Sequence, residues 1–160
     1  MARFQCTVKI IAGQTHGHRS VALLDYPLPH VNAIECFENL NVDNDRYHRK
    51  SFDMWLGNHH RPRRYHGWNR SEHGGKYTKC YVFKHVDEAE RFYGFLCHIK
   101  DGHPAHETCV LVLRAEKKTW KADTTELERA NDMRTNAYVL AALGDPKLFT
   151  EGEVTYTWLT

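Results

Sequence analysis

Residues 109–113 read Cys-Val-Leu-Val-Leu, a continuous apolar run within a chain of 160 residues. An unbroken run of this length is typical of a strand covered on both faces, because a half-exposed strand alternates apolar and polar side chains. The run therefore predicts a central strand in a sheet that carries helices. A chain of this length can bury about two thirds of its unfolded surface, so one domain can fold without disulfides or a structural metal.

Four other segments predict strands. Residues 4–10 and 154–158 alternate between apolar and polar side chains, as strands with one covered face do. Residues 21–24 and 80–86 are short runs rich in apolar side chains, and 21–24 lies close enough to 4–10 to pair with it as a hairpin. The sequence thus predicts about five strands.

Helical signals lie between these segments. A weak helical pattern covers residues 29–40, and Asn44 or Asp45 can cap a second helix that ends at Gly57. Two capping-box patterns follow in the C-terminal half. Asp87 and Glu90 form the first, ahead of an apolar stripe that runs to residue 99. Thr125 and Glu128 form the second, which opens a helix to about residue 143.

The C-terminal half therefore predicts the order β-α-β-α-β, with a helix crossing between neighbouring strands. We expect a single α+β domain over residues 1–160, with a mixed sheet of about five strands packed with three to four helices. The least periodic part is a basic, loop-rich segment at 57–77, which contains four glycines and a proline. Long segments of this kind are usually functional or mobile.

The five cysteines are odd in number and form no CxxC pair, which favours reduced thiols over a disulfide framework. The N-terminal residues lack the apolar core of a secretory signal, and no apolar run approaches the length of a membrane span. We therefore expect a soluble, cytoplasmic protein with no membrane partner.

Charge is unevenly distributed along the chain. Residues 46–79 contain nine lysines or arginines and two acids, a net charge of +7. The whole chain carries only +2, so the remainder carries −5. A local field of this size attracts a polyanion even though the overall charge is small.

Aromatic residues are interleaved with these cations. Single-stranded nucleic acid is bound by this combination, because cations pair with phosphates and flat rings stack on bases. We therefore expect RNA or single-stranded DNA to bind this segment through Arg49, Lys50, Arg61, Arg63, Arg64, Tyr65, Trp68 and Arg70.

Other interpretations of the segment stay open. Its arginines and histidines can simply be solvated, and its tryptophan and phenylalanine at 52–55 can face the core of a short helix. A basic surface also suits an acidic protein. Another hypothesis is therefore a protein-interaction or inhibitor module of viral or mobile-element type, with an acidic partner.

The twelve histidines raise the question of catalysis. Histidine can act as acid and base near neutral pH, as a metal-independent phosphodiesterase or ribonuclease requires. His59 and His66 are the candidates, with Arg63 or Arg64 to stabilise charge on the phosphate. A zinc site assembled from His59, His60, His66, His73 and Cys80 matches no standard spacing, and the arginines would repel a dication. We expect no metal and no cofactor.

Two short motifs point to another histidine pair. His18-Arg19-Ser20 and His106-Glu107-Thr108 each place a histidine two residues before a hydroxyl at the start of an apolar strand, so both side chains share one face. The pair resembles the paired His-x-Ser/Thr motifs of the 2H phosphoesterases. The resemblance covers six residues and implies that His18 and His106 act as acid and base on a phosphodiester.

Overall fold

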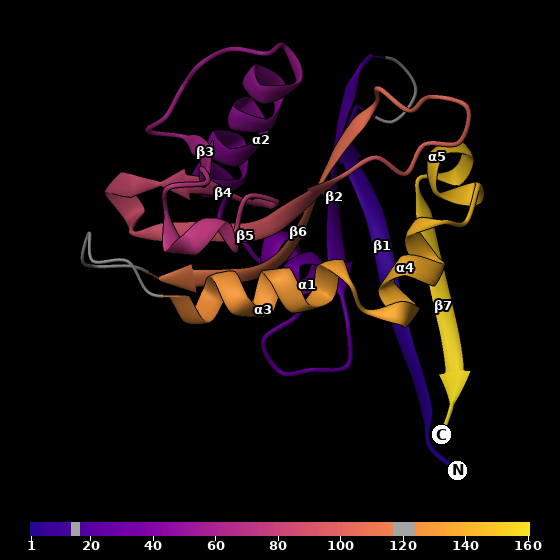
Figure 1. Cartoon of the computed structure of the whole chain (residues 1–160). Helices are drawn as coiled ribbons and strands as arrows, with labels where there is room; N and C mark the ends of the chain where they lie inside the picture. Colours follow the sequence, from indigo (N-terminus) through magenta and orange to yellow (C-terminus); the bar gives the residue numbers. More distant parts are fainter. Residues whose placement is uncertain (14–16, 117–123) are drawn as a thin grey trace.

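A seven-stranded mixed sheet forms the centre of the structure (Figure 1). The computed structural model describes residues 1–13, 17–116 and 124–160. The strands run in the spatial order β3-β4-β5-β6-β2-β1-β7, and β2 and β6 are the one parallel pair among them. Their bounds are β1 Arg3–Ala12, β2 Arg19–Asp25, β3 Tyr65–Gly67, β4 Cys80–His85, β5 Glu90–Cys97, β6 Glu107–Glu116 and β7 Glu153–Leu159.

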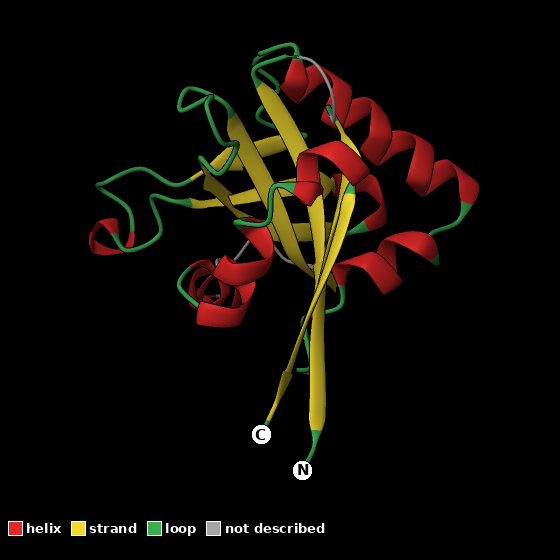
Figure 2. Cartoon of the chain, turned by 90° about the vertical axis from the view of Figure 1, so that its right-hand side faces the viewer, coloured by secondary structure: helices red, strands yellow, loops and turns green. Residues whose placement is uncertain are grey.

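Helices cover both faces of this sheet (Figure 2). The first face carries α1 Ala33–Glu38 and α2 Val42–Leu56, and the second carries α3 Thr124–Arg134, α4 Ala137–Leu143 and α5 Lys147–Glu151. Strand β6 contributes to both cores, since Cys109 and Leu111 face α1 and α2 while Val110 and Val112 face the other helices. The prediction of a covered central strand at 109–113 is therefore confirmed.

The α+β class and the mixed sheet are also confirmed, although the expected strand number of about five is slightly low. The described part of the chain has seven strands and five α-helices, together with the 3₁₀ turns η1 His73–Gly75 and η2 Val86–Glu88. The hairpin of the first two predicted strands is present as the antiparallel pair β1 and β2.

The helix predicted after residue 87 is wrong. Residues 86–89 form a tight turn that closes with Ala89 in the left-handed region (φ 52°), and β5 follows, paired with β4 and β6. Buried side chains on β5 lie on both faces of the sheet, whereas a helix would bury one stripe. Gly94 belongs to this arrangement, because a Cβ there would lie 2.0 Å from the carbonyl oxygen of Val110 on β6.

Two helix boundaries also differ from those predicted. Asn41, rather than Asn44 or Asp45, caps α2, since its side chain accepts a hydrogen bond from the backbone N–H of Asn44 at 2.8 Å. The helix ends at Gly57 as predicted. The single helix predicted over 125–143 is divided into α3 and α4, because Asn136 turns out of the helix and caps the backbone N–H groups of the next one.

The two chain ends lie side by side, where β1 and β7 extend as a two-stranded ribbon beyond the body of the sheet (Figures 1 and 2). Ala2 and Thr160 exchange both backbone hydrogen bonds at 3.1 Å. The five cysteines are free thiols, and burial raises the pKa of Cys6 and Cys80 to about 11. None of the helices in the described ranges has the length and hydropathy needed to cross a bilayer.

Candidate nucleic-acid interface

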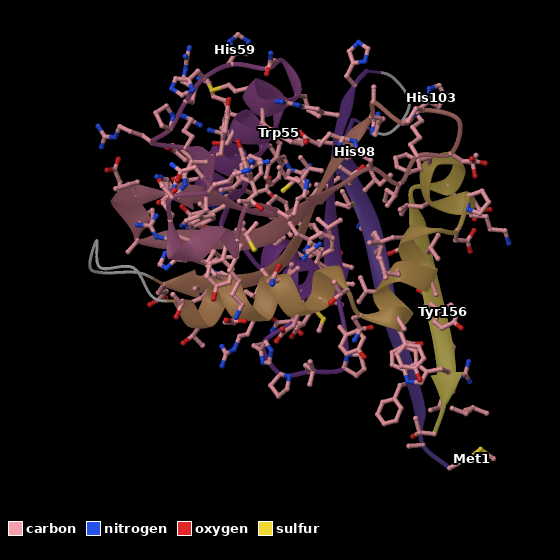
Figure 3. All side chains as sticks on the ribbon, in the orientation of Figure 1. Met1, Trp55, His59, His98, His103 and Tyr156 are labelled. Carbon is pink, nitrogen blue, oxygen red and sulfur yellow. The ribbon has the colours of Figure 1, made fainter. Side chains whose placement is uncertain are left out.

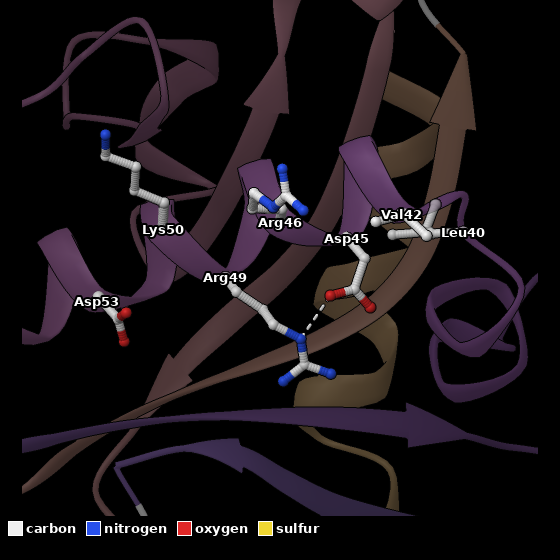
Figure 4. Close-up of a pocket in the computed structure, with 7 residues that line it drawn as sticks. All are labelled: Leu40, Val42, Asp45, Arg46, Arg49, Lys50 and Asp53. Carbon is white, nitrogen blue, oxygen red and sulfur yellow. Dashed lines mark hydrogen bonds and ion pairs between the residues drawn. The ribbon is translucent and has the colours of Figure 1, made fainter.

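Helix α2 presents a cationic outer face. Its inner face buries His48, Phe52 and Trp55 against the sheet, so the helical period turns Arg46, Arg49 and Lys50 outward. These three side chains line a pocket of about 530 Å³ together with Asp45 and Asp53 (Figure 4). Arg49 Nε pairs with Asp45 at 2.6 Å, whereas Arg46 and Lys50 form no ion pair with any residue that the structure describes.

The loop after α2 carries the arginine cluster. It runs from Gly57 to β3 and closes with a turn in which the backbone N–H groups of Arg64 and Tyr65 both donate to the carbonyl of Arg61. The hydroxyl of Tyr65 donates back to the carbonyl oxygen of His59, which fastens the loop to the strand. Tyr65 is buried against Phe83, so the end of the loop is anchored in the core.

A second pocket of about 540 Å³ lies where this loop meets α2 and η2. We call it the arginine pocket; its lining residues are Tyr47, His60, Arg61, Pro62, Arg63, Arg64, Val86 and Asp87. Arg61 and Arg63 are exposed, and none of the three arginines pairs with a carboxylate within the described ranges. The carboxylate of Asp87 offsets part of their charge, which leaves the lining at +2 with His60 neutral.

Arg64 is held in place by a stack of three side chains. Its Cζ lies 4.0 Å from the ring centroid of Tyr47, and that ring stacks on His85 with centroids 3.7 Å apart and planes 6° apart. Nη1 of Arg64 donates to Ser51 Oγ at 2.9 Å and to the Tyr47 carbonyl at 3.4 Å. Nε and Nη2 have no hydrogen-bond partner among the described residues, so the guanidinium is oriented while three of its five N–H donors remain free.

The aromatic candidates lie elsewhere than at this surface. Tyr65 is 5% exposed and belongs to the core under α2, and Trp68 packs on Tyr93 on the opposite face of the sheet. Arg70 is exposed in the loop after Trp68. The structure therefore brings together Arg61, Arg63 and Arg64 beside the outer face of α2, but it does not bring Trp68 or Tyr65 to them. Tyr47 was not predicted as a site residue, although it is one of the aromatic residues interleaved with the cations of 46–79.

His59 and His66 lie in different environments. His59 is exposed on the loop above α2, away from His98 and His103 (Figure 3). The ring of His66 contacts Trp68 with centroids 4.9 Å apart, and burial lowers the pKa of His66. No group of three metal-binding side chains converges within the part of the chain that is described.

The two His-x-Ser/Thr motifs lie side by side at the start of the parallel pair β2 and β6, with Ser20 opposite Thr108. His106 is 3% exposed, and both of its ring nitrogens are occupied. Nδ1 donates to the Gly17 carbonyl at 3.2 Å, so Nε2 accepts the hydroxyl of Ser20 at 3.0 Å, and Ser20 Oγ lies 2.9 Å from Thr108 Oγ1. His18 is exposed at the strand end. This geometry gives His106 a place in a buried hydrogen-bond network and leaves none of its ring nitrogens open to a substrate.

This network has a testable effect on stability. Burial lowers the pKa of His106, and also that of His30, His66 and His85, below the usual value of 6.5. The unfolded chain then binds protons at a higher pH than the folded chain, so we expect the free energy of unfolding to fall as the pH drops below about 6.5. Replacement His106→Gln should lower stability at pH 7 by about 1–3 kcal/mol and make the pH dependence shallower.

Urea unfolding between neutral and mildly acidic pH measures both effects. His103→Gln is the matched control, because His103 is exposed. A His106→Gln variant whose stability and pH profile match those of the control would contradict the proposed role of the network.

A buried ionic group lies next to the arginine pocket, on the inner side of α2. His48 Nε2 contacts Glu90 Oε1 at 2.6 Å, and Arg114 Nε donates to Glu90 Oε2 at 2.7 Å. His48 and Glu90 are 0% and 1% exposed. Burial alone would raise the pKa of Glu90, but His48 and Arg114 together hold it below its usual value. His48 immediately follows Tyr47, so this group fixes the turn of α2 from which Tyr47 contacts Arg64.

Comparisons with protein-family models, with curated protein sequences and with solved structures gave no match for this chain.

Proposed function

We propose that this protein binds single-stranded nucleic acid, RNA or DNA, through the arginine pocket and the adjoining outer face of α2. The observation that carries the proposal is the oriented guanidinium of Arg64, which lies beside Arg61 and Arg63 with no carboxylate partner in the described ranges. A planar fork held in one orientation suits a phosphate, because it donates two parallel hydrogen bonds.

The surface extends the contact beyond one phosphate. Arg46 and Lys50 lie on the helical turns next to Tyr47, so a strand crossing the arginine pocket passes these cations as well. His85 and Arg64 cover the two faces of the Tyr47 ring, so a base cannot stack on this ring. Nucleic-acid bases also stack on arginine guanidinium planes, and Arg64 provides such a plane at this surface. The site thus contacts the phosphate backbone of the nucleic acid and the flat faces of its bases, so it discriminates little between different bases.

The test is fluorescence anisotropy with labelled single-stranded oligonucleotides of about 12 nucleotides, titrated at several salt concentrations. Three to five phosphate contacts predict a slope of log K against log salt of about −2 to −3.5 for a single strand. Binding that does not change with salt, or no binding to RNA or DNA at low salt, would overturn the proposal. In that case capture of an acidic protein becomes the better explanation of the surface.

Arg64→Lys separates orientation from charge. Lysine keeps the positive charge but has neither the planar fork nor the stacking face, so we expect roughly a 5- to 10-fold loss of affinity with little change in salt slope. Arg129→Lys on α3 is the matched control, because it makes the same substitution on the opposite face of the sheet and should leave affinity unchanged. Equal affinities for the two variants would show that Arg64 does not contact the ligand.

A further inference from the structure

Strand β7 forms an open edge of the sheet. It pairs with β1 on one side, and no strand in the described part of the chain pairs with its other side. Ala2 and Thr160 exchange both backbone hydrogen bonds, so the even-numbered residues of β7 bond to β1. Glu153, Thr155, Thr157 and Leu159 therefore direct their backbone N–H and C=O groups to the open side.

This edge has little of the usual protection against strand addition, since its one charged residue is Glu153 at the start of the strand. Its sequence, Glu-Val-Thr-Tyr-Thr-Trp-Leu, contains no lysine and no proline, and its register against β1 is unbroken. The opposite edge of the sheet, β3, is only three residues long. The exposed large apolar side chains also gather at the β7 end. Of the seven found in the described ranges, four lie there: Met1, Leu140, Tyr156 and Leu159.

We propose that β7 pairs with β7 of a second copy of this chain, in antiparallel register about Tyr156, to give a continuous sheet across a two-fold axis. This register places Tyr156 opposite Tyr156, Val154 opposite Trp158, and Thr155 opposite Thr157 of the second copy. Every outward backbone group of β7 then has a partner. Cross-strand aromatic and threonine pairs of this kind stabilise antiparallel sheets.

Charge complementarity favours a second copy over an unrelated strand. In this register Glu153 lies opposite Leu159 of the second copy, and Leu159 is paired with Arg3 on β1 of its own chain. Glu153 and Arg3 of the second copy thus share one face, two strand spacings or about 10 Å apart between backbones, which two long side chains can span. Neither side chain has an ion-pair partner within the described ranges.

Analytical ultracentrifugation of the full chain in reducing buffer tests the proposal. We expect a reversible dimer, and Glu153→Arg or Arg3→Glu alone should weaken dimerisation about tenfold, since each change places like charges at two symmetric positions. The double variant Glu153→Arg/Arg3→Glu should restore the wild-type dissociation constant. Within one chain these residues lie at opposite ends of the ribbon, about 20 Å apart, so the rescue can only be intermolecular.

A second variant uses the backbone. Thr157→Pro removes an outward N–H that the β1–β7 ladder does not use, so we expect a monomer with unchanged circular dichroism. A wild-type chain that stays monomeric at about 100 μM, which corresponds to a binding free energy weaker than about −5.5 kcal/mol, would overturn the proposal. So would a dimer that is insensitive to the single charge reversals, or single variants that the double variant does not rescue.

Discussion

Replacing Arg61, Arg63 and Arg64 together with alanine is expected to reduce the affinity for single-stranded oligonucleotides on the order of 100-fold. Each guanidinium contributes about 1 kcal/mol through a largely solvent-exposed ion pair with a phosphate, and about 3 kcal/mol corresponds to slightly more than two powers of ten. The salt slope should fall by about 2, because each lost phosphate contact on a single strand removes about 0.7. Anisotropy titrations at several salt concentrations measure both quantities.

The control for this variant is a triple replacement of the same charge. Replacing Lys100, Arg129 and Lys147 with alanine also removes three positive charges. These residues lie away from the arginine pocket: Lys100 in the loop after β5, Arg129 on α3 and Lys147 on α5. If binding depends on a defined surface, the control keeps nearly all of its affinity. Equal losses in the two variants would mean that the chain attracts nucleic acid through net charge alone, and the assigned interface would be wrong.

Glu90→Ala is expected to lower the free energy of unfolding by about 3–5 kcal/mol, because it removes one partner of a buried ion pair and leaves the other unpaired. Glu90 is 1% exposed and joins His48 on α2 to Arg114 on β6. Without the Glu90 carboxylate, Nε2 of the fully buried His48 loses its hydrogen-bond partner. A loss of this size is a large part of the 5–15 kcal/mol that stabilises a typical domain.

Urea or thermal unfolding measures this loss, and Glu116→Ala is the matched control. Glu116 is 60% exposed and also pairs with Arg114, at 3.6 Å, so its loss should change stability by no more than about 0.5 kcal/mol. Similar small losses for both variants would show that burial of Glu90 contributes little. Glu90→Ala should also weaken nucleic-acid binding if the turn of α2 that carries Tyr47 shifts with it.

Residues whose environment follows from a local pattern were predicted well. The run at 109–113, the alternating segments at both ends of the chain and the stop of α2 at Gly57 depend on side-chain periodicity or on one residue type. The segment at 90–97 was mispredicted because its capping-box signal is compatible with a helix. What decides its structure is pairing with β4 and β6, including a backbone approach that only Gly94 allows, and that information lies outside the segment.

In the candidate site, too, local sequence predicts some features, whereas others depend on distant segments. The excess of arginine in one loop predicted which cations lie together, since neighbours in a short loop stay neighbours in space. The partners of those cations come from other elements: Tyr47 and Ser51 from α2, and His85 from the end of β4. The role of Glu90 also depends on distant segments. The sequence predicts a capping residue there, but Glu90 is the buried partner of His48 and Arg114.

The pairing of β1 with β7 bears on how the molecule refolds. Residues 3–9 meet residues 153–159, so this ladder closes a loop of nearly the whole chain, whereas β4, β5 and β6 form from neighbours in sequence. The entropy of closing a long loop is lost before its contacts form, which slows such steps. The local meander should therefore acquire hydrogen-exchange protection early, and the two ends of the chain should be protected last.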